Sequence, residues 1–222
     1  MSRINCMRPG CRDVFHAFLV ENAKYDGFLE IPIINPLKDI EKPKKLIVFS
    51  KAINSSEYDC WVHFYEDDAA FERIWNNPRK YLSILKKFKG VITPDFSLYR
   101  DMPLVMQFWN IYRSRAIGKW LQDNGIKVIV NVRFGDERTY RACCYAVPKY
   151  SIISIGSHGC LRIKEDRQLF IKGLEYVVKT IQPKVIIVYG TAPSNIFGKY
   201  KDMDIEILQF DSDYAISRGG EA

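Results

Sequence analysis

The chain has 222 residues, of which 47% are hydrophobic, and a formal net charge of +7. This length and composition suit one globular domain, with or without an appendage, and the chain is expected to fold alone. Its apolar runs fall far short of the roughly 18 residues that cross a bilayer, and the first residues lack a signal-peptide pattern, so we expect a cytoplasmic protein without a membrane partner.

Residues 1–59 lack a regular pattern and are expected to form an N-terminal arm that packs on the main fold, residues 60–222. Three prolines between residues 28 and 45 indicate an extended, irregular backbone. Residues 46–49 follow as a short strand candidate. We therefore expect the regular part of the fold to begin near residue 60.

The start of the chain also holds a loose metal-binding pattern. Cys6, Cys11 and His16 are spaced at the wide limit of a zinc site, and the remaining ligand would come from Cys143, Cys144 or Cys160. The alternative is that all six cysteines are reduced, structural thiols, because nothing in the sequence indicates secretion.

From residue 60 onward, short apolar runs alternate with helical periodicity. Six strands joined mostly by helices imply a parallel α/β sheet, with the last strand at an edge. Because a polar cluster follows each strand, we favour a small or incomplete β/α (TIM-like) barrel over an open doubly wound sheet. The strands are expected at residues 60–65, 91–93, 127–132, 151–155, 184–190 and 205–210, and helices at residues 71–75, 81–88, 101–124, 138–146 and 166–181.

The longest of these helices, residues 101–124, carries one apolar stripe. Arg113, Arg115 and Lys119 lie off the stripe and are expected to be exposed. The predicted stripe consists of Leu104, Val105, Phe108, Trp109, Tyr112, Ala116, Trp120 and Leu121.

Basic residues are concentrated around this helix. Residues 78–141 hold 13 Lys and Arg against 5 Asp and Glu, whereas residues 200–222 hold 2 against 6. A basic centre favours a polyanionic partner such as nucleic acid. The alternative is that these are solvated side chains on helix surfaces. The candidate phosphate contacts are Arg113, Arg115, Lys119, Arg138 and Arg141.

Polar side chains at the ends of the predicted strands form the candidate active site, because parallel strands bring their carboxyl ends to one edge. Asp95, Arg133, Asp136 and His158 are the catalytic candidates. An Arg that leaves a buried strand needs a phosphate or carboxylate partner, and His158 lies between two glycines. The alternative is that Asp and Ser here only cap helices and form turns. Further polar residues at these ends are His63, Glu66, Asp67, Asp68, Ser97, Asn131, Ser157, Tyr189, Thr191, Asp211 and Asp213.

No cofactor motif accompanies these residues. The chain has no P-loop, no Gly-x-Gly-x-x-Gly after a strand, no Gly-x-Ser-x-Gly and no His-Glu-x-x-His. A divalent metal held by carboxylate oxygens is the cofactor that the strand-end residues would suit.

Several stretches together resemble a family of bacterial and phage proteins. Gly90–Ser97, Met102–Arg115 and Val130–Asp136 carry the likeness, which residues 156–160 and 188–190 extend to roughly residues 28–197. The family is known as a domain of unknown function common on phages and other mobile elements. The resemblance implies that the protein comes from a phage or another mobile element, and it does not identify any catalytic residue.

Three functions follow as hypotheses. The first is a phage- or plasmid-associated protein that binds or processes nucleic acid in replication or another DNA-processing step. The second is a barrel-type enzyme for a nucleotide or another small phosphorylated molecule, with Arg133 holding the anion and Asp95 or His158 moving protons. The third is a host-interaction protein without catalysis.

Overall fold

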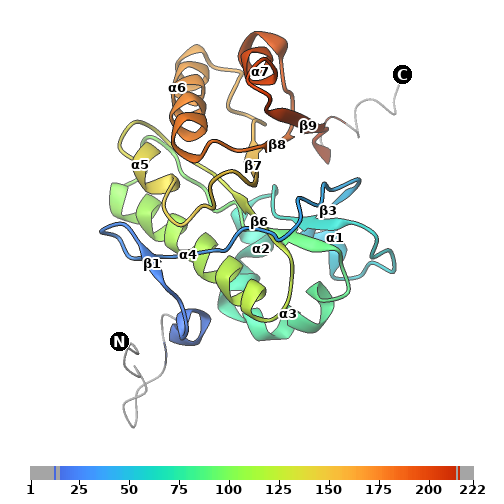
Figure 1. Cartoon of the computed structure of the whole chain (residues 1–222). Helices are drawn as coiled ribbons and strands as arrows, with labels where there is room; N and C mark the ends of the chain where they lie inside the picture. Colours follow the sequence, from blue (N-terminus) through green and yellow to red (C-terminus); the bar gives the residue numbers. More distant parts are fainter. Residues whose placement is uncertain (1–12, 14–15, 214, 216–222) are drawn as a thin grey trace.

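The computed structural model describes residue 13, residues 16–213 and residue 215 (Figure 1). Its main feature is one sheet of seven strands, and each strand pairs in parallel with its neighbours along the chain. The predicted parallel α/β class is therefore confirmed. The strands are β3 (Leu46–Val48), β4 (Trp61–His63), β5 (Gly90–Ile92), β6 (Val128–Asn131), β7 (Ile152–Gly156), β8 (Val185–Tyr189) and β9 (Glu206–Phe210).

The sheet curls into a half-barrel with helices. Its strand order has no reversal, unlike that of a doubly wound sheet. The predicted edge position of the last strand is confirmed by β9, and β3, from the predicted arm, forms the other edge. The regular fold thus begins before residue 60, with a seventh strand.

Helices connect the strands and pack on one face of the sheet. Strand residues alternate between the two faces, so Val91, Val128 and Ile153 join the large core with helical side chains such as Phe71 and Leu174. The helices are α1 (Phe49–Ala52), α2 (Asp68–Asn76), α3 (Pro78–Leu85), α4 (Leu104–Asp123), α5 (Tyr140–Cys143), α6 (Lys164–Ile181) and α7 (Ser194–Lys201).

The inner face of the half-barrel has a second, smaller apolar core. Trp61, Ile92 and Ile129 belong to it, and Leu37 and Ile40 from the N-terminal segment pack against it. These side chains fill part of the inner face, and two cavities lie beyond them at the carboxyl ends of the strands.

The two open edges of the half-barrel are joined by side chains. Lys42, before β3, forms an ion pair with Glu206 of β9 at 2.5 Å. Lys51 of α1 forms another with Asp213, beyond β9, at 2.6 Å. These contacts link the first and last strands of the sheet, and the residues next to them, to each other.

The N-terminal residues cover the outside of the central helix. They form the short helix η1 (Ala17–Val20) and the antiparallel pair β1 (Tyr25–Asp26) and β2 (Ile31–Pro32). Both η1 and β2 contact α4. The predicted zinc ligands Cys6 and Cys11 lie outside the described residues, while the His16 ring packs edge-on against Trp75. None of the helices along the described residues has the length and apolar character of a membrane span.

The predicted apolar stripe of α4 is wrong in part. Val105 is 73% exposed and Trp109 is 41% exposed, although both were placed on the buried face. In contrast, Gln107 and Asn110 are buried. The physical reason is that α4 lies between the sheet and the N-terminal segment, so both of its sides are covered, and periodicity alone does not locate its exposed part.

Candidate functional site

Two adjoining cavities lie at the carboxyl ends of the strands. The larger has a volume of about 700 Å³ and the smaller about 460 Å³. Both are lined by Tyr99, Arg133 and His158, so the cavities meet at these three side chains. Asp95 also lines the larger cavity. The structure therefore brings together three of the four catalytic candidates, Asp95, Arg133 and His158.

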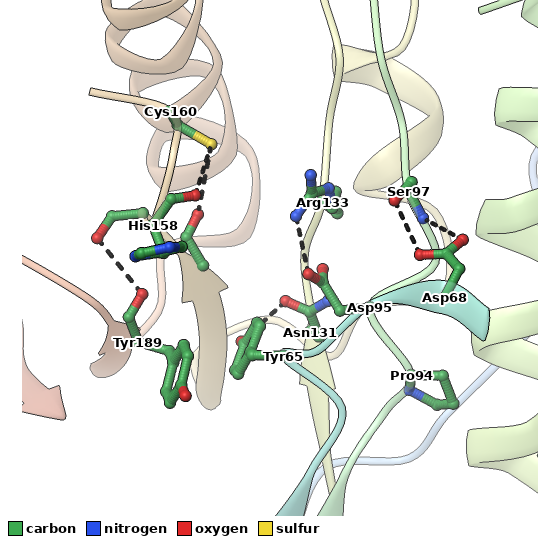
Figure 2. A network of polar contacts seen from close by, with 12 residues as sticks. Tyr65, Asp68, Pro94, Asp95, Ser97, Asn131, Arg133, His158, Cys160 and Tyr189 are labelled. Carbon is green, nitrogen blue, oxygen red and sulfur yellow. Dashed lines mark hydrogen bonds and ion pairs between the residues drawn. The ribbon is translucent and has the colours of Figure 1, made fainter. Parts of the chain in front are cut away.

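Asp95 and Arg133 form the polar centre of this edge (Figure 2). Arg133 Nη1 donates to Asp95 Oδ2 at 2.8 Å, and Asn131 Nδ2 donates to Asp95 Oδ1 at 2.6 Å. The Asp95 side chain is 9% exposed and that of Arg133 is 25% exposed. Asp95 follows β5, whereas Asn131 and Arg133 come from the end of β6, so register between these parallel neighbours sets the contact.

The hydrogen bonds around Asp95 all run in one direction. The Tyr65 hydroxyl donates to Asn131 Oδ1 at 3.0 Å, so Ser154, 2.6 Å away, must donate to Tyr65. Donors thus follow one another from Ser154 through Tyr65 and Asn131 to the Asp95 carboxylate. This orientation stabilises the ionised carboxylate against the cost of its burial.

Burial and charge shift the pKa values of the pair. Burial raises the pKa of the Asp95 carboxyl above its ordinary value, and it outweighs the opposing effects of Arg133 and Asn131. Burial would lower the pKa of Arg133, but the nearby Asp95 charge outweighs it, and the pKa of Arg133 is raised. Arg133 is therefore a permanent cation at this site.

Three rings line the inner face beside this pair. Tyr65 and Tyr189 stack with centroids 4.6 Å apart, and His63 lies 4.6 Å from Tyr189. Burial raises the pKa of Tyr65 well above its ordinary value and lowers the pKa of His63 to about 4. His63 Nδ1 accepts the backbone N–H of Tyr65. His63 is thus a neutral core histidine, which agrees with its position within an apolar strand.

The opposite wall of the larger cavity is built on Asp68, at the start of α2. Asp68 accepts the Ser97 backbone N–H at 3.1 Å and the Ser97 hydroxyl at 2.8 Å. The Ser97 hydroxyl is also hydrogen-bonded with that of Tyr99 at 3.0 Å. These contacts hold the loop after β5 against α2 and place carboxylate and hydroxyl oxygens side by side.

The loop after β7 forms the third side. His158 is exposed, and the following Gly159 has a φ of +80°, which favours glycine. The Cys160 side chain points back towards the backbone oxygens of residues 156 and 158 (Figure 2). Burial raises the pKa of the Cys160 thiol, which disfavours the nucleophilic thiolate.

Asp136 does not join the other three candidates. Its carboxylate accepts from Arg138 Nε at 3.0 Å and from Arg138 Nη2 at 2.7 Å. The hydrogen bond from Arg138 lowers the pKa of Asp136. Neither residue lines the two cavities. Two predicted functional residues therefore form a local ion pair with each other.

The expectation that Arg113, Arg115 and Lys119 are exposed is wrong. Their side chains are buried, with residue exposures of 8%, 2% and 7%. Arg113 pairs with Glu72 at 2.5 Å, Lys119 pairs with Asp123, and Arg115 donates to backbone oxygens. Elements other than the N-terminal segment cover two of these positions: Arg113 packs against α2 and the Phe96 ring, and Arg115 lies between α4, β6 and α5.

Other predictions have mixed outcomes. Arg138 and Arg141 are exposed as a phosphate contact requires, and their role stays a prediction. Within the described part of the chain, no group of three or more His, Cys, Asp and Glu side chains is arranged to hold a metal ion. We therefore assign no metal to the carboxylates of the site.

Sequence reasoning missed Tyr65, Tyr99 and Ser154. Ser154 lies within the apolar run of β7, and register pairs it with Asn131 of β6. A polar residue at an inward position of a buried strand was the available signal. Nothing in the sequence marked Tyr65 or Tyr99 among thirteen tyrosines.

Comparison with known proteins places the chain in a family. The family described as "Domain of unknown function (DUF4417)" matches residues 23–211. The chain belongs to this family. The resemblance read from the sequence is thereby confirmed, and the DUF4417 match includes every strand of the half-barrel. No solved structure shows a significant match.

Two curated relatives of this DUF4417 chain come from mycobacteriophages. It is 37% identical over 129 residues to "Gene 1 protein" of Mycobacterium phage L5, covering 58% of this chain and 56% of the relative. It is 36% identical over 129 residues to "Gene 1 protein" of Mycobacterium phage D29, covering 58% and 48%. The match thus spans about half the length of these relatives.

Proposed function

We propose that the chain is an enzyme that binds a small phosphorylated molecule at the carboxyl edge of the half-barrel. The observation that carries this proposal is the position of Arg133 where the two cavities meet. Asp95 accepts a hydrogen bond from Nη1 only, and among the described residues no partner is found for Nε or Nη2 of this side chain, which is 25% exposed. A guanidinium with two such donors suits the oxygens of a phosphate.

The surrounding groups support roles in proton transfer. Arg133 would hold the anionic group, and Asp95, whose pKa burial raises, would accept or return a proton. His158 lines both cavities and is the second candidate for this role. The volumes of about 700 and 460 Å³ lie in the range of small-molecule sites.

The first test is the binding of inorganic phosphate and adenosine 5′-monophosphate to the full chain, measured by titration calorimetry. Arg133→Gln is expected to weaken binding about tenfold or more, because a charge-assisted contact is lost. Arg141→Gln is the matched control, since Arg141 is exposed and lines neither cavity, so the substitution removes the same charge away from the site. No binding at millimolar concentration, or equal loss in both variants, rejects the proposal.

A second test addresses catalysis. Phosphorylated sugars and nucleotides are incubated with the protein, and turnover is followed by phosphorus NMR. His158→Gln and Asp95→Asn are expected to reduce turnover by about 100-fold or more, the usual contribution of general acid–base catalysis. Unchanged turnover in both variants removes these two residues from the proposed mechanism.

Nucleic-acid binding is the second candidate, favoured by the formal charge of +7 and by exposed Arg138 and Arg141. The buried cations of α4 no longer support it. Binding of DNA and RNA would be measured at low and moderate salt, with an Arg138→Glu/Arg141→Glu variant alongside. Binding that weakens steeply with salt and is lost in the variant supports this function. Salt-insensitive binding, or its absence, removes it.

A further inference from the structure

The larger cavity carries more negative charge than its salt bridges balance. Asp95 is paired with Arg133, and Asp213 is paired with Lys51. Glu66, Asp67 and Asp68 also line this cavity, and no salt bridge to them occurs among the described residues. A phosphate would be repelled from this wall.

The smaller cavity suits a phosphate better. Arg100 and Arg133 line it together with His158, against the carboxylates of Asp101 and Asp166. Arg100 lies 3.5 Å from Asp166, longer than a close ion pair. The electrostatic difference between the cavities therefore directs an anionic group to the smaller one, where Arg133 reaches it.

The carboxylates of the larger cavity are spread along its wall. Among the described residues, no three acidic, His or Cys side chains converge as a metal site requires. Asp68 lies next to the hydroxyls of Ser97 and Tyr99. A row of hydrogen-bond acceptors of this kind matches a molecule with several hydroxyl donors.

We infer that the ligand is a phosphorylated sugar, free or as part of a nucleotide, that spans both cavities. This inference rests on the proposed function. The phosphate lies in the smaller cavity on Arg133 and Arg100. The sugar hydroxyls lie in the larger cavity and donate to Asp68 and Glu66.

The experiment measures the affinity of the full chain for ribose 5-phosphate, adenosine 5′-monophosphate, inorganic phosphate and phosphoethanolamine. Ribose 5-phosphate is expected to bind at least about tenfold more tightly than inorganic phosphate. Asp68→Asn should remove most of this difference and leave phosphate binding within about twofold. Asp59→Asn is the matched control, because Asp59 pairs with Lys89 outside the cavities. If adenosine 5′-monophosphate binds more tightly than ribose 5-phosphate, the protein recognises the sugar phosphate as part of a nucleotide.

The outcomes separate the inference from the proposed function. If inorganic phosphate and ribose 5-phosphate bind with equal affinity and Arg133→Gln loses both, the inferred binding of a sugar is rejected, while the proposed phosphate site at Arg133 is retained. Preference for phosphoethanolamine also overturns it, in favour of an amine. Phosphate binding that is absent, or unaffected by Arg133→Gln, rejects both. Should Asp68→Asn not fold, as judged by circular dichroism, Glu66→Gln and Tyr99→Phe replace it with the same expected result.

Discussion

Asp95 Oδ2 and Arg133 Nη1 lie 2.8 Å apart across the carboxyl ends of two neighbouring strands, 38 residues apart in the chain. The contact depends on the parallel pairing of β5 with β6. It places one cation and one carboxylate where the two cavities meet. Stability measurements can therefore probe the geometry of the site independently of any ligand.

Asp95→Asn is expected to destabilise the fold by about 2 kcal/mol, because it leaves the largely buried Arg133 cation without its counter-charge. Asp59→Asn, which breaks an exposed ion pair with Lys89, should cost less than about 1 kcal/mol. Urea unfolding at pH 7 measures both. Equal changes in the two variants would contradict the burial assigned to the Asp95–Arg133 pair.

His63 is expected to make the fold sensitive to mild acid. Burial lowers its pKa from 6.5 to about 4, so between these pH values His63 is protonated in the unfolded chain and neutral in the folded chain. This contribution to stability is complete above pH 6.5 and is lost as the pH falls towards 4; by pH 5 about 2 kcal/mol is lost. His63→Asn should flatten this part of the stability profile in denaturant unfolding. An unchanged slope would remove His63 as its source.

Arg115→Gln is expected to destabilise the fold by about 3 kcal/mol or more. Arg115 is 2% exposed and donates to the backbone oxygens of Asn131 and Cys143, both at 2.9 Å, so its loss leaves buried acceptors unsatisfied. Thermal unfolding measures the effect, with exposed Arg141→Gln as the control, expected within about 0.5 kcal/mol. A variant as stable as wild type would show that Arg115 is not a structural residue.

Two glycine substitutions should act in opposite directions. A Cβ at Gly90 of β5 would lie 2.3 Å from the Trp61 ring, so Gly90→Ala is expected to destabilise by about 1–3 kcal/mol. A Cβ at Gly198 of α7 meets nothing within 4 Å, so Gly198→Ala should stabilise by about 0.5–1 kcal/mol. Thermal unfolding of both variants gives the sign of each effect. A stabilised Gly90→Ala would contradict the packing of the inner core.

Much of the fold could be predicted from the chain because it depends on local patterns. Short apolar runs separated by helical periods imply parallel strands, and strand ends such as Asp95 and Arg133 then share one edge. The same pattern correctly predicts that His158, which follows β7, lies at this edge. Asp136 also follows a strand, but its carboxylate pairs with Arg138 two residues later instead of joining the site.

The exposure of α4 was decided by the tertiary structure. Periodicity identifies an apolar side of a helix, but Arg113, Arg115 and Lys119 are buried as well. Arg113 contacts Glu72 of α2 and the Phe96 ring, and Arg115 reaches backbone oxygens of β6 and α5. The same holds for Tyr65 and Ser154, whose hydrogen bonds join the segment after β4 to β6 and β7. Local sequence governs which residues form strands and helices. Long-range packing governs which polar groups are buried together, because that depends on contacts between segments far apart in the chain.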